Sequence, residues 1–92
     1  MLIGTLQIHL SLPSRTLKEK RRIVNSLKDR TRSKFNASVA EVEYNDDCHN
    51  ALIGIAVVSN NGNHLNSVLC SIIDFINAEF PGLMSDYKVE IL

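Results

Sequence analysis

Cysteine and histidine stand side by side in the segment Asn45–Asn50 (N-D-D-C-H-N), where two carboxylates precede them. These residue types could bind a metal ion or form a Cys-His nucleophile. Side chains that are neighbours in a turn seldom converge on one point, however, and the second cysteine, Cys70, falls in a distant predicted helix. No second ligand pair stands at zinc-finger spacing. We therefore expect no metal site and no catalytic nucleophile in this segment.

Recognised catalytic and cofactor-binding motifs are also missing from the chain. The sequence contains no glycine-rich phosphate loop, no G-x-S-x-G and no H-E-x-x-H. His9 and His64 are isolated from other candidate ligands. The sequence therefore predicts a protein that is not an enzyme and that has no cofactor and no evident small-molecule substrate.

One lysine falls among apolar positions at the start of a predicted helix. Thr16 and Glu19 form a T-x-x-E pattern, which is typical of the capped N-terminus of a helix. Lys20 then lies within the apolar arc of that helix, so its ammonium group must extend to solvent or find an anionic partner. Lys20 with Glu41 could form a buried polar site. The alternative is that they are ordinary ion-pair or surface groups.

The charges are unevenly distributed along the sequence. The formal net charge is zero, yet nine of the ten Lys and Arg residues lie between positions 15 and 34 with only two carboxylates, which gives that segment a formal charge of +7. The remainder of the chain carries −7. Such an asymmetry indicates a polyanionic partner, or the association of oppositely charged surfaces.

The basic segment matches a helix that could bind phosphate groups. Lys and Arg at helical spacing neutralise phosphates and release counterions, and the free N–H groups near the helix N-terminus could hold one more phosphate. The alternative is a solvated helix face without a ligand. The residues expected to contact phosphates are Arg15, Thr16, Lys18, Arg21, Arg22, Lys28, Arg30 and Arg32.

Hydrophobic periodicity predicts six elements. Alternation indicates a strand over Leu2–Leu12, and a 3.6-residue period indicates a helix from Thr16 to about Lys34. A moderately amphipathic strand over Phe35–Tyr44 and an almost wholly apolar one over Ala51–Ser59 follow. A second amphipathic helix runs from Leu65 to Phe80, and Met84–Leu92 alternates as a last strand.

The order βαββαβ predicts an α+β fold, a ferredoxin-like sandwich in which two helices cover one face of a four-stranded antiparallel sheet. All 92 residues fit one such domain, residues 1–92. The first and third strands are central, and their uncovered face would hold Ile3 with either Leu52, Ala56 and Val58 or the alternate set of the third strand. We expect the alternate set, so that Ile3, Ile53, Ile55 and Val57 form a homodimer face.

Three short blocks of sequence are similar to a known family. They are Thr16–Arg21 (T-L-K-E-K-R), Phe35–Glu41 (F-N-A-S-V-A-E) and Gly54–Asn60 (G-I-A-V-V-S-N), followed by His64. In this order and spacing the chain resembles the bacterial YlxP-like family, a ferredoxin-like domain of unknown function. Genes of this family tend to lie near genes for translation initiation and ribosome maturation factors. Its members commonly carry a tryptophan in the turn before the third strand, which this chain lacks.

Composition narrows the choice of function. Aromatic residues make up 5% of the chain and tryptophan is absent, so a platform that stacks bases on aromatic rings is disfavoured. No apolar run approaches the length of a membrane span, and the two cysteines do not form a disulfide scaffold, so we expect a cytoplasmic protein without a membrane partner. The sequence predicts a binding protein that contacts RNA or a ribosomal particle through its first helix. The alternative is a homodimeric protein-interaction or ligand-sensing regulatory module that uses the open sheet face.

Overall fold

The computed structural model describes all 92 residues of the chain. Its elements are β1 (Leu2–Ser11), α1 (Leu17–Lys34), β2 (Ser38–Glu43), β3 (Asn50–Ser59), α2 (Gly62–Glu79) and β4 (Met84–Ile91). The predicted order βαββαβ is confirmed, and every boundary lies within three residues of its predicted position.

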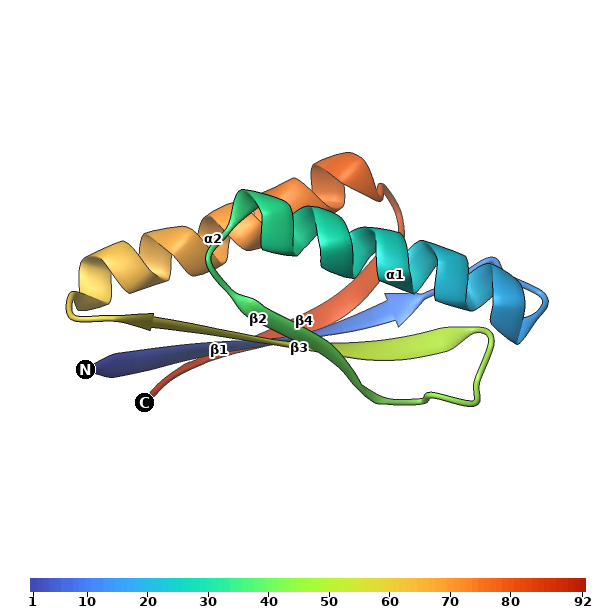
Figure 1. Cartoon of the computed structure of the whole chain (residues 1–92), viewed down its shortest axis with the longest axis horizontal. Coiled ribbons are helices and arrows are strands. Elements are labelled where there is room, and N and C mark those ends of the chain that lie inside the picture. Colours follow the sequence, from blue (N-terminus) through green and yellow to red (C-terminus); the bar gives the residue numbers. More distant parts are fainter.

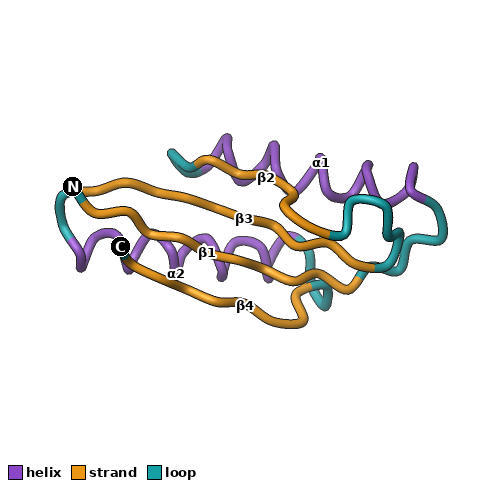
Figure 2. Tube along the Cα trace, turned by 90° about the horizontal axis from the view of Figure 1, so that it is seen from below, coloured by secondary structure: helices purple, strands orange, loops and turns teal.

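The four strands form one antiparallel sheet in the order β2-β3-β1-β4. Helices α1 and α2 lie across one face of this sheet (Figure 1). The opposite face carries no covering element when the molecule is seen from below (Figure 2). The predicted ferredoxin-like sandwich is therefore confirmed, with β1 and β3 as the central strands.

Fifteen buried hydrophobic side chains form one core between the sheet and the two helices. The core is almost entirely aliphatic, as expected for a chain with few aromatic residues. The two helices contribute Val24, Leu27, Leu65, Leu69, Ile72 and Ile76, and the central strands contribute Leu6, Ile8, Leu10, Ala51, Ile53, Ile55 and Val57. Both central strands are therefore held to the helices by apolar packing along most of their length.

The prediction that Ile53, Ile55 and Val57 face solvent was wrong, because all three side chains are buried beneath the helices. Register explains the difference: Ile8 lies opposite Ile53 and Leu6 lies opposite Ile55. Residues directly opposite each other in an antiparallel pair share one face of the sheet. Since Leu6 and Ile8 point to the helices, the odd-numbered residues of β3 do so too.

The open face of β3 consequently carries the other set of side chains. These are Leu52, Gly54, Ala56 and Val58, and Ile3 stands opposite Val58 on β1, so Ile3 was assigned to the correct face. Val58 is 59% exposed, whereas Ile3 is half-buried. The open face is less apolar than expected because smaller residues occupy its centre.

A side-chain cap lies at the start of each helix, and for α1 it is Thr16, as the sequence indicated. Thr16 Oγ1 accepts a hydrogen bond from the Glu19 backbone N–H at 3.1 Å, and Asn61 Oδ1 accepts one from the His64 N–H at 3.0 Å. The Glu19 carboxylate in turn accepts a bond from the Arg15 N–H at 3.0 Å. Neither helix is long and apolar enough to cross a membrane.

Candidate functional site

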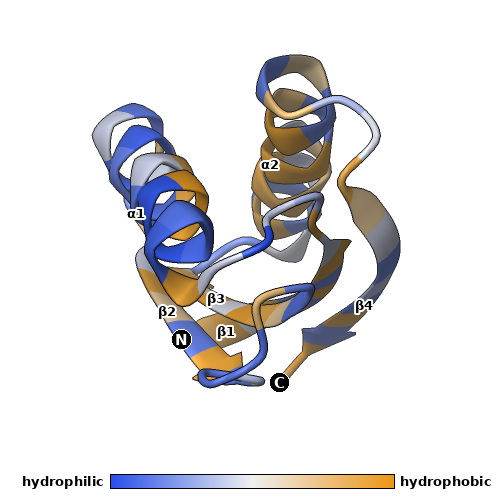
Figure 3. Ribbon diagram, turned by 90° about the vertical axis from the view of Figure 1, so that its right-hand side faces the viewer, coloured by the Kyte–Doolittle hydropathy of each residue, from blue (hydrophilic) through white to orange (hydrophobic).

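Helix α1 presents most of its cationic side chains to solvent. Lys18, Arg21 and Arg22 are exposed and Lys28 is half-buried, because the apolar residues of the helix occupy only the side that packs on the sheet. The outward side of α1 is hydrophilic along its length (Figure 3). None of the four ion pairs in the structure involves these residues or Arg15. We call Arg15, Lys18, Arg21, Arg22 and Lys28 the basic stripe.

The remaining cations of α1 make contacts within the protein. Arg30 lies 3.7 Å from the Glu79 carboxylate, and its guanidinium stands 5.4 Å from the centre of the Phe80 ring. Arg32 donates a hydrogen bond to the Val39 carbonyl on β2, and it lies 3.8 Å from Asp29. These contacts offset the charge of Arg30 and Arg32. The eight predicted phosphate contacts are therefore not equivalent.

The helix N-terminus is less suited to a phosphate than the sequence suggested. Thr16 Oγ1 is already bound to the Glu19 N–H, and the Glu19 carboxylate sits against the Arg15 N–H. A negative charge at this position already complements the positive end of the helix and would repel a phosphate. Thr16 therefore serves as a helix cap, and we omit it from the basic stripe.

Lys20 is buried, with 1% of its side chain exposed, and its ammonium group is surrounded by oxygen atoms. Nζ lies 2.8 Å from Glu41 Oε2, and it donates hydrogen bonds to the Asp47 carbonyl at 2.6 Å and to the Tyr44 carbonyl. Glu41 Oε2 is itself buried and accepts no other hydrogen bond. Lys20 and Glu41 therefore form a buried ion pair. The Lys20 ammonium also holds the loop between β2 and β3 through the Tyr44 and Asp47 carbonyls.

The Lys20 contacts hold Tyr44 in an unusual backbone conformation. Tyr44 has φ of 65°, in the left-handed region that side-chain-bearing residues rarely adopt. Its carbonyl is one of the three oxygen atoms around the ammonium of Lys20. The role of Lys20 is structural, because the three hydrogens of its ammonium all face oxygen atoms of the protein itself.

The loop segment that contains Cys48 and His49 is organised around Asp47. Asp47 Oδ1 accepts a hydrogen bond from the His49 N–H at 2.8 Å, and Oδ2 accepts one from Asn50 Nδ2 at 3.0 Å. Cys48 is half-buried and has no disulfide partner. The structure contains no group of three or more His, Cys, Asp or Glu side chains that could hold a metal ion.

Acid should destabilise this loop through Asp47. The hydrogen bond from the His49 N–H, followed by the one from Asn50, lowers the pKa of the Asp47 carboxyl below its usual value. The folded state therefore binds its proton less readily than the unfolded state, so the stabilisation exists above the unfolded-state pKa and is lost as pH falls. We expect the thermal midpoint of the wild type to fall more steeply between about pH 5 and pH 2 than that of Asp47→Asn. Parallel profiles would contradict this assignment.

A chain of hydrogen bonds that sequence reasoning missed runs across the end of the open sheet face. His9 Nδ1 is bound to Ser85 Oγ, and His9 Nε2 lies 2.9 Å from Asn50 Oδ1. Because Asn50 Nδ2 donates to Asp47, its Oδ1 faces His9, and Nε2 must carry the hydrogen. The single hydroxyl hydrogen of Ser85 has two acceptors within reach, His9 Nδ1 and the His9 carbonyl, the latter at 3.1 Å.

This chain of hydrogen bonds joins residues from three strands and one loop. Ser85 and His9 are 76 positions apart in the sequence, so no local motif could have connected them. The only available signals were a histidine on the polar side of β1 and the positions of Asp47 and Asn50 on either side of Cys48. The network ties the start of β4 to the loop that Lys20 holds from the other side of the sheet.

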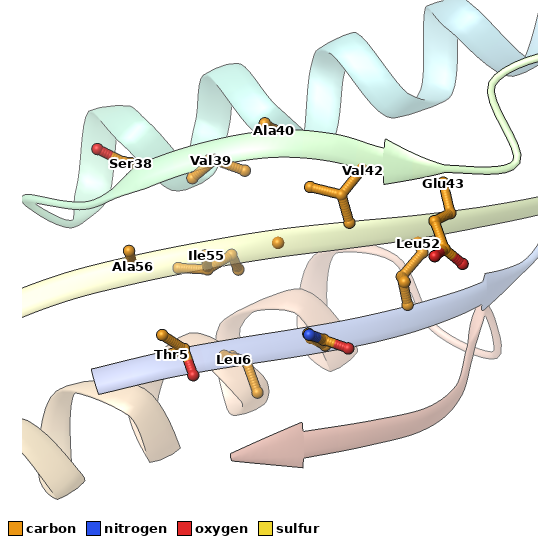
Figure 4. A pocket seen from close by; sticks show the side chains of 12 residues that line it. Thr5, Leu6, Ser38, Val39, Ala40, Val42, Glu43, Leu52, Ile55 and Ala56 are labelled. Atoms are coloured by element: carbon orange, nitrogen blue, oxygen red, sulfur yellow. The ribbon is translucent and has the colours of Figure 1, made fainter. Parts of the chain in front are cut away.

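The open face is hollowed where β1, β2 and β3 adjoin (Figure 4). The hollow has a volume of about 520 Å³ and is lined mainly by apolar groups. Gly54 lies at the bottom of the hollow. A Cβ atom added to Gly54 would lie 3.0 Å from Val42 Cγ1, so a side chain at position 54 would collide with Val42. A bulge in β2 between Glu41 and Glu43 brings Val42 over this glycine.

Comparison with known proteins relates the chain to one family and to one fold. The family described as "Protein of unknown function (DUF503)" matches residues 3–89. The "Uncharacterized protein YlxP" of Bacillus subtilis (strain 168) is 35% identical over 66 residues, which cover 72% of this chain and 71% of that protein. Neither description assigns an activity or a partner.

The solved structures similar to this one include designed proteins. The de novo designed protein Foldit4 has a TM-score of 0.60 at 10% identity, covering 99% of this chain and 94% of its own. The de novo designed protein LFR1 1 with ferredoxin fold, solved by NMR, has a TM-score of 0.56 at 13% identity, covering 100% and 83%. At such identities the likeness shows the fold alone.

Proposed function

The chain belongs to the DUF503 family of proteins of unknown function, and we propose that it is a cytoplasmic binding protein that contacts structured RNA, on a ribosomal particle, through the basic stripe of α1. The observation that carries this proposal is that five cations, Arg15 just before α1 and four along the helix as far as Lys28, have no anionic side-chain partner within the chain. Unpaired cations gain more from a phosphate than cations that already contact carboxylates.

The dimensions of the basic stripe suit a nucleic-acid backbone. Lys18 and Lys28 are ten residues apart, so they are separated by about 15 Å along the helix axis. That length spans several phosphates of one strand, and such contacts position a protein without reading the base sequence. The open faces of β1 and β3 carry no Phe, Tyr or Trp, so we assign the RNA contact to the helix and not to the sheet.

We also propose that the protein has no catalytic activity. One polar cluster supports this: the Lys20 ammonium is buried, and its hydrogens face acceptors of the protein itself. A nucleophile needs a free lone pair and a nearby base that can take its proton. The Lys20 ammonium instead connects α1 to β2 and to the loop that follows β2.

The proposal is tested by sedimenting the purified protein with ribosomal subunits, and with naked structured ribosomal RNA, across a salt series. Five phosphate contacts predict a log–log slope of roughly −4, and about a 10²-fold loss of affinity between about 50 and 200 mM salt. Binding to subunits but not to naked RNA would assign the contact to a ribosomal protein. An affinity that does not change with salt, or no binding at low salt, would overturn the proposal.

A second candidate function is favoured by the hollow on the open sheet face. Val42 is 50% exposed at its rim and Val58 is 59% exposed on the same face. We propose as the alternative that this face binds a second copy of the chain, in a dimer that serves protein interaction or ligand sensing. Such a dimer would be abolished by Val58→Glu, as measured by sedimentation velocity, and would be insensitive to substitutions in β4.

A further inference from the structure

Strand β4 is the edge of the sheet with an unpaired backbone. Leu92 exchanges two hydrogen bonds with Ile3 of β1, at 2.8 and 3.1 Å. In an antiparallel ladder, successive residues direct their N–H and C=O groups to alternate sides. Glu90 and Lys88 therefore bond β1 as Leu92 does. The backbone groups of Tyr87, Val89 and Ile91 point away from the sheet. All of them are free to pair with another strand except the Tyr87 N–H, which donates to Asp86 Oδ1 at 2.8 Å.

The other edge of the sheet, β2, is protected against such pairing. The Arg32 guanidinium binds the Val39 carbonyl, and the bulge between Glu41 and Glu43 distorts the strand. Bulges and charged side chains are common means of blocking an edge strand. In β4 the only irregularity lies at its start, opposite the His9–Leu10 step, and the ladder is regular from Asp86 to Ile91. The free edge is therefore β4.

The side chains of this edge form an exposed apolar row. Tyr87, Val89 and Ile91 stand opposite Ile8, Leu6 and Gly4, so they lie on the helix side of the sheet. They are nevertheless 52%, 36% and 45% exposed. Figure 3 shows the reason, since β4 curves away from α2 and the helix leaves this side of the strand uncovered.

The opposite side of the same strand carries alternating charges. Asp86, Lys88 and Glu90 stand opposite His9, Gln7 and Thr5 on the open face. Lys88 Nζ lies 2.9 Å from Glu90 of the same strand. A strand with free backbone groups, an apolar row on one side and alternating charges on the other is complementary to an antiparallel copy of itself.

We propose that β4 pairs with β4 of a second copy of the chain about a two-fold axis at Val89. In this register Tyr87 stands opposite the partner's Ile91 on the apolar side. On the charged side, Lys88 stands opposite the partner's Glu90, and the reverse pair forms by symmetry. Opposite charges directly across two strands stabilise the pairing, and like charges oppose it.

The charges exclude the registers on either side of this one. Centring the axis on Lys88 places Lys88 against the partner's Lys88 and Asp86 against the partner's Glu90. Centring it on Glu90 places two glutamates together. The register centred on Tyr87 pairs Asp86 with the partner's Lys88, but it runs into the irregular start of β4 and leaves Ile91 unpaired.

The edge dimer is independent of the proposed RNA contact. The strand order places β4 at one edge of the sheet, and α1 packs near β2 at the other. A two-fold axis perpendicular to the sheet would leave both basic stripes exposed on the same side of one continuous sheet that runs through both copies. The oligomeric state therefore tests this inference, whatever the outcome of the RNA experiment.

Charge reversal of two residues provides the test. In Lys88→Glu the introduced carboxylate would face the partner's Glu90, and in Glu90→Lys the introduced ammonium would face the partner's Lys88. We expect each single variant to dimerise at least about tenfold more weakly than the wild type in sedimentation velocity across a concentration series. The double variant Lys88→Glu/Glu90→Lys restores both opposite-charge pairs and should dimerise as the wild type does.

Mixing the two single variants gives a second readout. Their cross-strand pairs are complementary to each other, so the mixture should form heterodimers although neither variant forms stable homodimers. Val58→Glu, on the open sheet face, is the matched control and should leave the dimer intact. A monomeric wild type, a double variant that stays monomeric, or a dimer abolished only by Val58→Glu would overturn the β4 interface.

Discussion

Replacing Lys20 with methionine is expected to lower the free energy of unfolding by about 3–5 kcal/mol. Methionine matches the apolar stem of the lysine side chain but removes the ammonium that lies 2.8 Å from Glu41 Oε2. Glu41 would then hold a buried carboxylate oxygen with no compensating charge. The carbonyls of Tyr44 and Asp47 would also lose their donor. Urea denaturation followed by circular dichroism measures the loss.

Two controls separate the loss of the ion pair from the loss of packing. Lys28→Met changes a half-buried lysine of the same helix that makes no ion pair, and it should cost less than about 1 kcal/mol. Lys20→Met/Glu41→Leu removes both charges, and it should recover much of the stability lost in the single variant, because no buried charge is left unpaired. Equal losses in Lys20→Met and Lys28→Met would contradict the assigned role.

Reversing charge at the start of α1 is expected to remove most of the affinity for RNA. Arg21→Glu/Arg22→Glu deletes two of the five cations of the basic stripe and adds two negative charges beside the others. We expect affinity for structured RNA to fall by about 10²-fold at low salt, and the log–log salt slope to become shallower by about two. Filter binding across a salt series measures both quantities.

The matched control reverses two cations on the same helix. Arg30→Glu/Lys34→Glu produces the same change in net charge, but Arg30 is near Glu79 and Lys34 stands over the ring of Phe75. Both side chains already contact α2, so this variant should lose only several-fold in affinity. Circular dichroism confirms that both variants fold. Equal losses would mean that net charge alone attracts the RNA, without a site on α1.

Local patterns of the sequence predicted the order of the elements and the start of α1 correctly. A period of two in β1 and of 3.6 residues in α1 required no knowledge of the neighbours, and Thr16 capped its helix through a residue three positions away. The basic segment could be located for the same reason. These features depend on contacts within one turn or one strand, so the sequence displays them directly.

A buried ion pair for Lys20 was one of two possibilities that the sequence left open, whereas the rest of its environment could not be predicted. Its position on the apolar arc required the ammonium either to extend to solvent or to find an anionic partner, for which Glu41 was a candidate. The two carbonyls that complete the site belong to Tyr44 and Asp47, in a loop 24 and 27 residues away. A backbone carbonyl is present at every residue, so the sequence carries no mark of which ones will bind an ammonium.

The orientation of β3 depends on its pairing with a distant strand. Both of its alternating sets of residues are apolar or small, so hydrophobicity could not orient the strand, and Ile53 and Ile55 were assigned to the wrong face. Pairing with β1 fixed the orientation, because Leu6 and Ile8 could be buried by only one face of the sheet. Packing of α1 against α2 and β2 likewise decided which of its cations contact other groups of the protein and which remain free. Elements, caps and charge thus follow from neighbours along the chain, while register and packing between distant segments select the side chains that remain available to a partner.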